Sequence, residues 1–82
     1  MSKLSIIMPV FNAEKYLREA IDSIIQQSFT EWELLIINDG STDSSESIIQ
    51  SYADKRIQYH RNDQNIGLIS TLNKGIDICR GD

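Results

Sequence analysis

Several features that mark common functional classes are scarce in this chain of 82 residues. Cys79 is the single cysteine, which excludes an internal disulfide framework. His60 is the single histidine, so no catalytic triad or zinc-ligand cluster is apparent, and we expect a structural role for it. The strongly apolar runs are short, far below the roughly 20 residues that a membrane-spanning helix needs.

Positive charge and glycine are scarce as well. The formal net charge is −4, and the 8 Lys and Arg residues are scattered along the chain. A nucleic-acid or anionic-membrane surface normally shows a basic stripe, so we expect no nucleic-acid partner. The 4 glycines form neither a dinucleotide-binding fingerprint nor a P-loop. A cytoplasmic protein, or one at the cytoplasmic face of the membrane, fits these properties.

The chain does contain a repeated pattern of strand, loop and helix. The spacing predicts strands at 4–8, 32–37 and 57–60, and helices at 12–27, 43–53 and 68–79. We expect one domain over residues 1–82, a three-layer α/β, Rossmann-like half-domain with a mostly parallel sheet and local strand order 3-2-1. The first strand would then have an open edge, paired either with further chain or with a second copy in a homo-oligomer.

The sequence also predicts where these elements begin and end. Pro9 cannot donate to a strand ladder, so we expect the first strand to stop there. Asn12 has the side chain of a helix N-cap, with Glu14 in the first turn. Asp43 and Glu46 have the spacing of a capping box. These boundaries place polar loops at the carboxyl ends of the first two strands, where open α/β sheets bind ligands.

The loop after the second strand holds the strongest candidate for ligand binding. Asp39 follows an apolar run and precedes Gly40 and Ser41, so its carboxylate can accept hydrogen bonds while the backbone lies close to a ligand. From this loop alone, an Asx-type turn that caps the next helix explains the same residues equally well. Phe11 likewise suits either a wall against a flat base or packing on the following helix.

Together these segments resemble the start of the family 2 glycosyltransferases, which have the GT-A fold and use nucleotide-sugar donors. The matching segments run in order over nearly the whole chain, at 5–12, 16–24, 27–29, 32–43, 65–67, 73–76 and 80–82. Any one of them is a weak signal, but the combination is highly specific. Asn38 departs from the pattern, because the family usually has Asp at this position.

The resemblance implies an inverting enzyme of cell-wall or polysaccharide biosynthesis that transfers a sugar from a nucleoside-diphosphate sugar, typically a UDP-sugar, to an acceptor hydroxyl of a glycan or another molecule. In the family, the residue matching Asp39 hydrogen-bonds the base and the one matching Glu14 often lies near the nucleotide. The nucleotide-binding residues expected here are Pro9, Val10, Phe11, Asn12, Glu14, Asp39, Gly40, Ser41, Asn65 and Gly67.

The resemblance also implies what this chain does not supply. The family's D-x-D motif, which holds Mg²⁺ or Mn²⁺ against the diphosphate, comes after the position of Asp82, so we expect the chain to be truncated before it. The acceptor-binding half and the general base are expected beyond it as well. The resemblance therefore implies a piece with no metal ligands or catalytic residues that is inactive alone. A non-catalytic nucleotide-binding or interaction module and a receiver-like regulatory domain stay open as alternatives.

Overall fold

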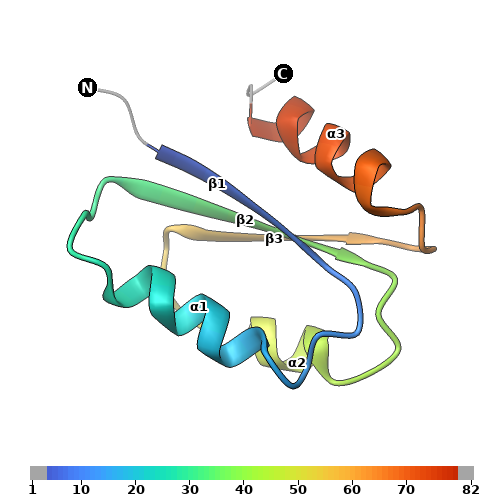
Figure 1. Cartoon of the computed structure of the whole chain (residues 1–82), viewed down its shortest axis with the longest axis horizontal. Coiled ribbons are helices and arrows are strands. Elements are labelled where there is room, and N and C mark those ends of the chain that lie inside the picture. The colour runs from blue at the N-terminus through green and yellow to red at the C-terminus, as the bar shows by residue number, and fades with distance from the viewer. Residues whose placement is uncertain (1–3, 80–82) are drawn as a thin grey trace.

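The computed structural model describes residues 4–79, in which strands and helices alternate in the predicted order (Figure 1). The strands are β1 (Leu4–Val10), β2 (Trp32–Asp39) and β3 (Ile57–Asn62). The helices are α1 (Leu17–Gln26), α2 (Ser45–Gln50) and α3 (Leu68–Cys79). The predicted family match at residues 80–82 lies outside the described residues.

The three strands form one parallel sheet in the order β1-β2-β3, which confirms the predicted arrangement. β2 is central, and nearly all of its residues are buried. Helices α1 and α2 cover one face of the sheet and α3 covers the other (Figure 1), which gives the three predicted layers. Within residues 4–79, the outer edge of β1 pairs with no further strand.

The layer of α1 and α2 contains most of the apolar core. Leu17 and Ile21 of α1 pack against Leu34 and Ile36 of β2, and all four are almost fully buried. Side chains alternate along a strand, so these two β2 residues point toward α1 and α2 while their neighbours point toward α3. Burial of each such side chain stabilises the fold by about 1.5–3 kcal/mol. The helical periodicity seen in the sequence therefore corresponds to this packing.

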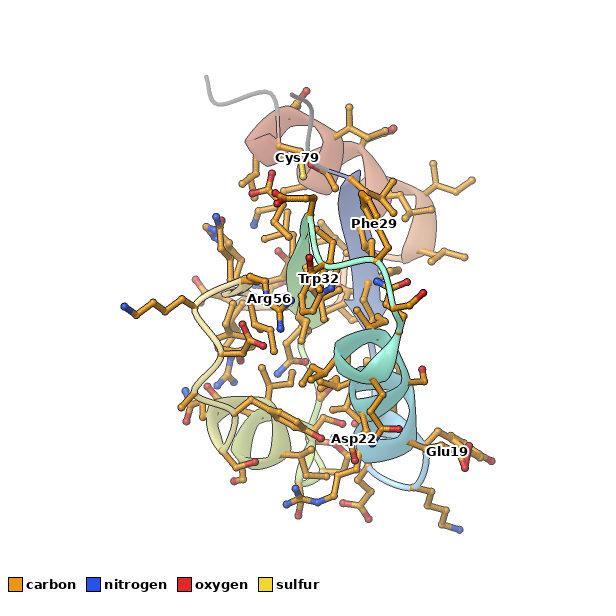
Figure 2. All side chains as sticks on the ribbon, turned by 90° about the vertical axis from the view of Figure 1, so that its left-hand side faces the viewer. Glu19, Asp22, Phe29, Trp32, Arg56 and Cys79 are labelled. Carbon is orange, nitrogen blue, oxygen red and sulfur yellow. The ribbon has the colours of Figure 1, made fainter. Side chains whose placement is uncertain are left out.

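The amino end of β2 is closed by a stacked pair of side chains. Trp32 is 1% exposed, and the Arg56 guanidinium lies 3.9 Å from the centre of its ring. Figure 2 shows the two side chains next to each other. Arg56 is in turn held by the Asp54 carboxylate at 2.7 Å. This cluster closes the end of the sheet opposite to the polar loops.

Helix α3 lies close to the sheet because Gly75 has no side chain. A Cβ atom at this position would be 2.7 Å from Ile7 Cγ2 and 3.1 Å from Ile37 Cδ1. Glycine costs a helix interior about 1 kcal/mol relative to alanine. The close approach offsets that cost, and it fixes the start of α3 above the carboxyl ends of β1 and β2.

Two boundaries predicted near the first loop are wrong. β1 continues through Pro9 to Val10, which pairs with Asn38 of β2. Because β1 is an outer strand of this sheet, the proline can direct its missing N–H away from β2. Asn12 does not cap α1, which begins only at Leu17 after a turn. Asn12 instead has a positive φ of 49°.

The predicted capping box at the start of α2 is also wrong. The N-cap of α2 is Ser44, and the helix begins two residues later than predicted, at Ser45. Asp43 Oδ1 accepts a hydrogen bond from the Ser45 N–H at 2.9 Å. The Glu46 carboxylate does not fold back but pairs with Arg61 of β3 at 2.7 Å. A partner on a neighbouring strand has replaced the local contact that the spacing suggested.

Candidate functional site

The carboxyl ends of the strands and the start of α3 surround a cavity of about 370 Å³. It is lined by Pro9, Val10, Phe11, Asp39, Asn65, Gly67, Leu68 and Thr71. All of these except Leu68 and Thr71 were predicted from the sequence. Phe11 is 51% exposed, so its ring lines the cavity instead of being buried against α1. The sequence had left both positions of this ring open.

Asp39 is the charged group of the cavity. The residue is 4% exposed and ends β2. Its Oδ1 accepts hydrogen bonds from the Ile66 N–H at 2.8 Å and from Asn62 Nδ2 at 2.9 Å. Its Oδ2 accepts one from the Gly67 N–H at 3.0 Å. Asp39 therefore holds the loop after β3 and lines the cavity, and its carboxylate bonds with that loop instead of with the Asx-type turn that was the other interpretation. Contact between Asp39 and a ligand stays a prediction.

These bonds decide the charge of the carboxyl group. Burial by itself raises the pKa of Asp39, but hydrogen bonding from the Ile66 N–H, the Asn62 amide, the Gly67 N–H and the Thr71 hydroxyl outweighs it and lowers the pKa below its ordinary value. The group is therefore ionised at neutral pH. An ionised carboxylate accepts hydrogen bonds and donates none. The cavity thus offers an acceptor to an N–H or O–H group of a ligand.

The segment that follows β1 and contains Phe11 is hydrogen-bonded to the loop after β2. The Asn12 N–H donates to Ser41 Oγ at 2.9 Å, and Asn12 Oδ1 accepts from the Thr42 N–H at 2.8 Å. These reciprocal bonds account for the positive φ of Asn12, because asparagine tolerates the left-handed region better than most residues. They fix the direction in which the chain leaves β1.

A second reciprocal pair joins the same two loops. The Glu14 N–H donates to Asp43 Oδ2 at 3.1 Å, and Glu14 Oε1 accepts from the Ser44 N–H at 2.8 Å. Four predicted residues therefore do not line the cavity, namely Asn12, Glu14, Gly40 and Ser41. Contact between these four and a nucleotide stays a prediction.

Gly40 brings the loops after β2 and β3 together. Its φ is +73°, and a Cβ atom here would lie 2.8 Å from the backbone nitrogen of Asn65. Asn65 Nδ2 donates to the Asp39 carbonyl oxygen at 3.2 Å, which joins the same loops from the other side. Only glycine permits this approach, so Gly40 positions Asn65 at the cavity without lining it.

Two polar side chains at the site were not predicted from the sequence. Asn62 was expected in a loop, but β3 extends to it and the register places it opposite Asp39. Thr71 lies on α3 with no exposed surface. For Asn62, the available signal was the parallel alignment of β2 and β3, because the last residues of neighbouring parallel strands lie at the same edge of a sheet.

No three His, Cys, Asp or Glu side chains come close enough together within residues 4–79 to hold a metal ion. Asp82, which the resemblance placed before the metal motif, lies outside the described residues. Over the same part of the chain, no helix has the length and apolar character needed to cross a membrane.

The sequence matches the model of glycosyl transferase family 2 over residues 5–82. The chain belongs to this family. A receiver-like domain is thereby excluded. Related proteins include an uncharacterized glycosyltransferase of Rickettsia typhi, 43% identical over 96% of this chain and 24% of its own length. Glycosyltransferase GlyA of Streptococcus pneumoniae is 41% identical over 96% of this chain and 12% of its own length.

Solved structures of glycosyltransferases share the fold of this family 2 chain. TarS of S. aureus in complex with UDP-GlcNAc superposes with a TM-score of 0.86 at 30% identity, over 93% of this chain and 23% of that protein. The mannosyltransferase PcManGT of Pyrobaculum calidifontis, in complex with GDP-Man and Mn²⁺, has a TM-score of 0.83 at 20% identity, over 92% of this chain and 24% of that protein. The GT-A fold is therefore confirmed. The chain spans about a quarter or less of the length of these proteins.

Proposed function

We propose that this chain supplies the base- and ribose-binding part of an inverting enzyme that transfers a sugar from a UDP-sugar to an acceptor hydroxyl. The observation that carries the proposal is the cavity, where the apolar wall from Pro9 to Phe11 and the ionised Asp39 carboxylate line the same space. A flat base needs an apolar or aromatic surface for its face and a polar partner for its edge.

Two considerations support uridine as the nucleoside. The imide N–H of uracil is a donor that suits the Asp39 acceptor, whereas the corresponding nitrogen of cytosine is itself an acceptor and would face the carboxylate unfavourably. TarS, 30% identical over most of this chain, was solved with UDP-GlcNAc. Asn12, Glu14, Gly40 and Ser41 would then act on the nucleotide chiefly by fixing the surrounding loops.

The remaining chemistry belongs, in this proposal, to parts of the enzyme other than residues 4–79. The departing diphosphate calls for a divalent cation, Mg²⁺ or Mn²⁺, and the acceptor hydroxyl calls for a general base. The 82-residue chain by itself is therefore inactive as a transferase. The open edge of β1 would pair with the rest of the enzyme or with a second copy, in the cytoplasm or at its membrane face.

Titration calorimetry of the chain with UDP, first with Mn²⁺ and then with EDTA, tests the proposal. We expect weak binding that does not depend on the metal, and still weaker binding of CDP. Asp39→Asn keeps the shape of the side chain but removes its charge. It should weaken UDP binding by about 10–150-fold, since a hydrogen bond to a charged group contributes about 1.5–3 kcal/mol.

Asp63→Asn is the matched control, because Asp63 is an exposed carboxylate that directly follows β3 at the same edge of the sheet, and this variant should leave the affinity unchanged. Equal affinities of the native chain and the Asp39→Asn variant would remove Asp39 from the site. Absence of UDP binding in both metal conditions would mean that the chain has the fold without a working nucleotide site.

A further inference from the structure

Asp39 is joined to α3 through a chain of polar side chains that the sequence did not suggest. Asn62 Nδ2 donates to Asp39 Oδ1 at 2.9 Å and also reaches Thr71 Oγ1 at 3.3 Å. Asn62 Oδ1 accepts from Lys74 Nζ at 2.6 Å. Asn62 is 4% exposed and Thr71 is fully buried. Lys74, which looks like an ordinary surface charge in the sequence, therefore contacts a buried amide next to the cavity.

The charges of Asp39 and Lys74 together fix which way the Asn62 amide points. In the observed orientation, the NH₂ group faces a carboxylate and the oxygen faces an ammonium group, so both contacts are favourable. A flipped amide would place its oxygen against the Asp39 carboxylate and its NH₂ against the Lys74 ammonium group, and both contacts would be repulsive. Within residues 4–79, Lys74 is the one charged side chain hydrogen-bonded to Asn62 other than Asp39.

This orientation in turn decides which Asp39 oxygen is occupied. An ionised carboxylate has about four acceptor positions, two on each oxygen. Asn62 and Ile66 take both positions on Oδ1, whereas Gly67 takes one on Oδ2. The Thr71 hydroxyl lies near the same carboxylate and also helps to lower its pKa. Asp39 lines the cavity, and Oδ2 is the oxygen with fewer hydrogen bonds, so we infer that a ligand would bond to Oδ2.

We propose that Asn62 and Lys74 are positioning residues, which hold the Asp39 carboxylate so that Oδ2 accepts the imide N–H of a uracil base. This inference rests on the proposed function. It adds that selectivity for an N–H donor depends on a lysine of α3 that does not line the cavity. The competing explanation is that the hydrogen bond between Lys74 and Asn62 only joins α3 to β3. In that case its loss would lower the stability of the fold without changing the preference for UDP over CDP.

The first arm of the test needs no nucleotide. The titration of the Asp39 carboxyl group is followed by ¹³C NMR in the native chain and in Lys74→Met, Lys74→Arg and Lys55→Met. Loss of the cation loosens the Asn62 donor, so Lys74→Met should raise the pKa of Asp39, whereas Lys74→Arg keeps a charged donor and should restore most of the native value. Lys55→Met is the control, because Lys55 is exposed and precedes β3 at the opposite end of the strand.

A double substitution separates action through Asn62 from direct attraction between the two charges. In an Asn62→Ala background, Lys74→Met should have no further effect on the Asp39 titration, because the amide that links the two residues is gone. An equal effect in both backgrounds would overturn the proposal. An unchanged titration in Lys74→Met alone would overturn it as well, and that variant changes an exposed side chain and should fold.

The second arm measures binding of UDP and CDP to the same variants. Lys74→Met should weaken UDP binding by about tenfold and reduce the preference for UDP over CDP. Native affinity and native preference in this variant would refute the positioning role. If the native chain binds no UDP, the proposed function fails, while the titration alone still decides whether Lys74 acts on Asp39 through Asn62.

Discussion

Replacement of Gly40 by alanine tests how closely the loops after β2 and β3 approach each other. Gly40 has a φ of +73°, which costs a residue with a Cβ about 1–2 kcal/mol. The added methyl group would also lie 2.8 Å from the backbone nitrogen of Asn65 and 3.1 Å from the carbonyl carbon of Gln64. These are backbone atoms and cannot rotate away, so the loops must separate, at about 1–3 kcal/mol more. The total loss of unfolding free energy should be about 2–5 kcal/mol.

Gly67→Ala provides the matched control within the same site. Gly67 also has a positive φ, +94°, but a Cβ atom added there meets nothing within 4 Å. This variant should therefore lose only the unfolding free energy that corresponds to the positive φ, about 1–2 kcal/mol. Urea unfolding of both variants measures the difference, and NMR shifts of the Asn65 and Ile66 amides show whether the loop has moved.

The result that would refute this reasoning is equal destabilisation by the two substitutions together with unchanged amide shifts in Gly40→Ala. The loops would then not be in contact at Gly40. The placement of Asn65 at the cavity would need another explanation.

Two further predictions concern stability. Hydrogen bonds from Arg56 lower the pKa of Asp54 to about 2, and the pKa values of Asp39 and Asp43 are also lowered. A lowered pKa in the folded state stabilises the fold above the unfolded-state value near 4, so stability should fall as the pH drops from about 4 to 2. Asp54→Asn should remove part of this pH dependence, about 1 kcal/mol at most after solvent screening, in urea unfolding followed against pH. Gly75→Ala should destabilise the chain by about 1–2 kcal/mol, because the clash with Ile7 exceeds the gain in helix propensity. A double-mutant cycle with Ile7→Ala should show coupling between the two sites, and simple additivity would contradict the close approach of Gly75 to Ile7.

The alternation of elements and the place of the main carboxylate were readable from the sequence. The apolar run that ends at Ile37 has the length and composition of a buried parallel strand, and Asp39 comes two residues later. Such signals are local, because strand and helix periodicity depend on neighbouring residues. Right-handed crossover then gives the strand order. The cavity residues Pro9, Phe11 and Gly67 were predictable for the same reason, since each lies next to a strand end.

The tertiary structure decided what the polar side chains do. Asn12 and Asp43 were expected to cap their own helices, but Asn12 binds the neighbouring loop, and Asp43 bonds with that loop as well as with the Ser45 N–H of α2. Nothing in the sequence around Asn62 or Lys74 indicated a role at the site. The sheet register places Asn62 next to Asp39, and the close packing of α3 on the sheet brings Lys74 to Asn62. A side-chain donor or acceptor bonds with the partner that folding brings within about 3 Å. That partner is often distant in sequence, so spacing along the chain determined the elements and only their packing determined the site.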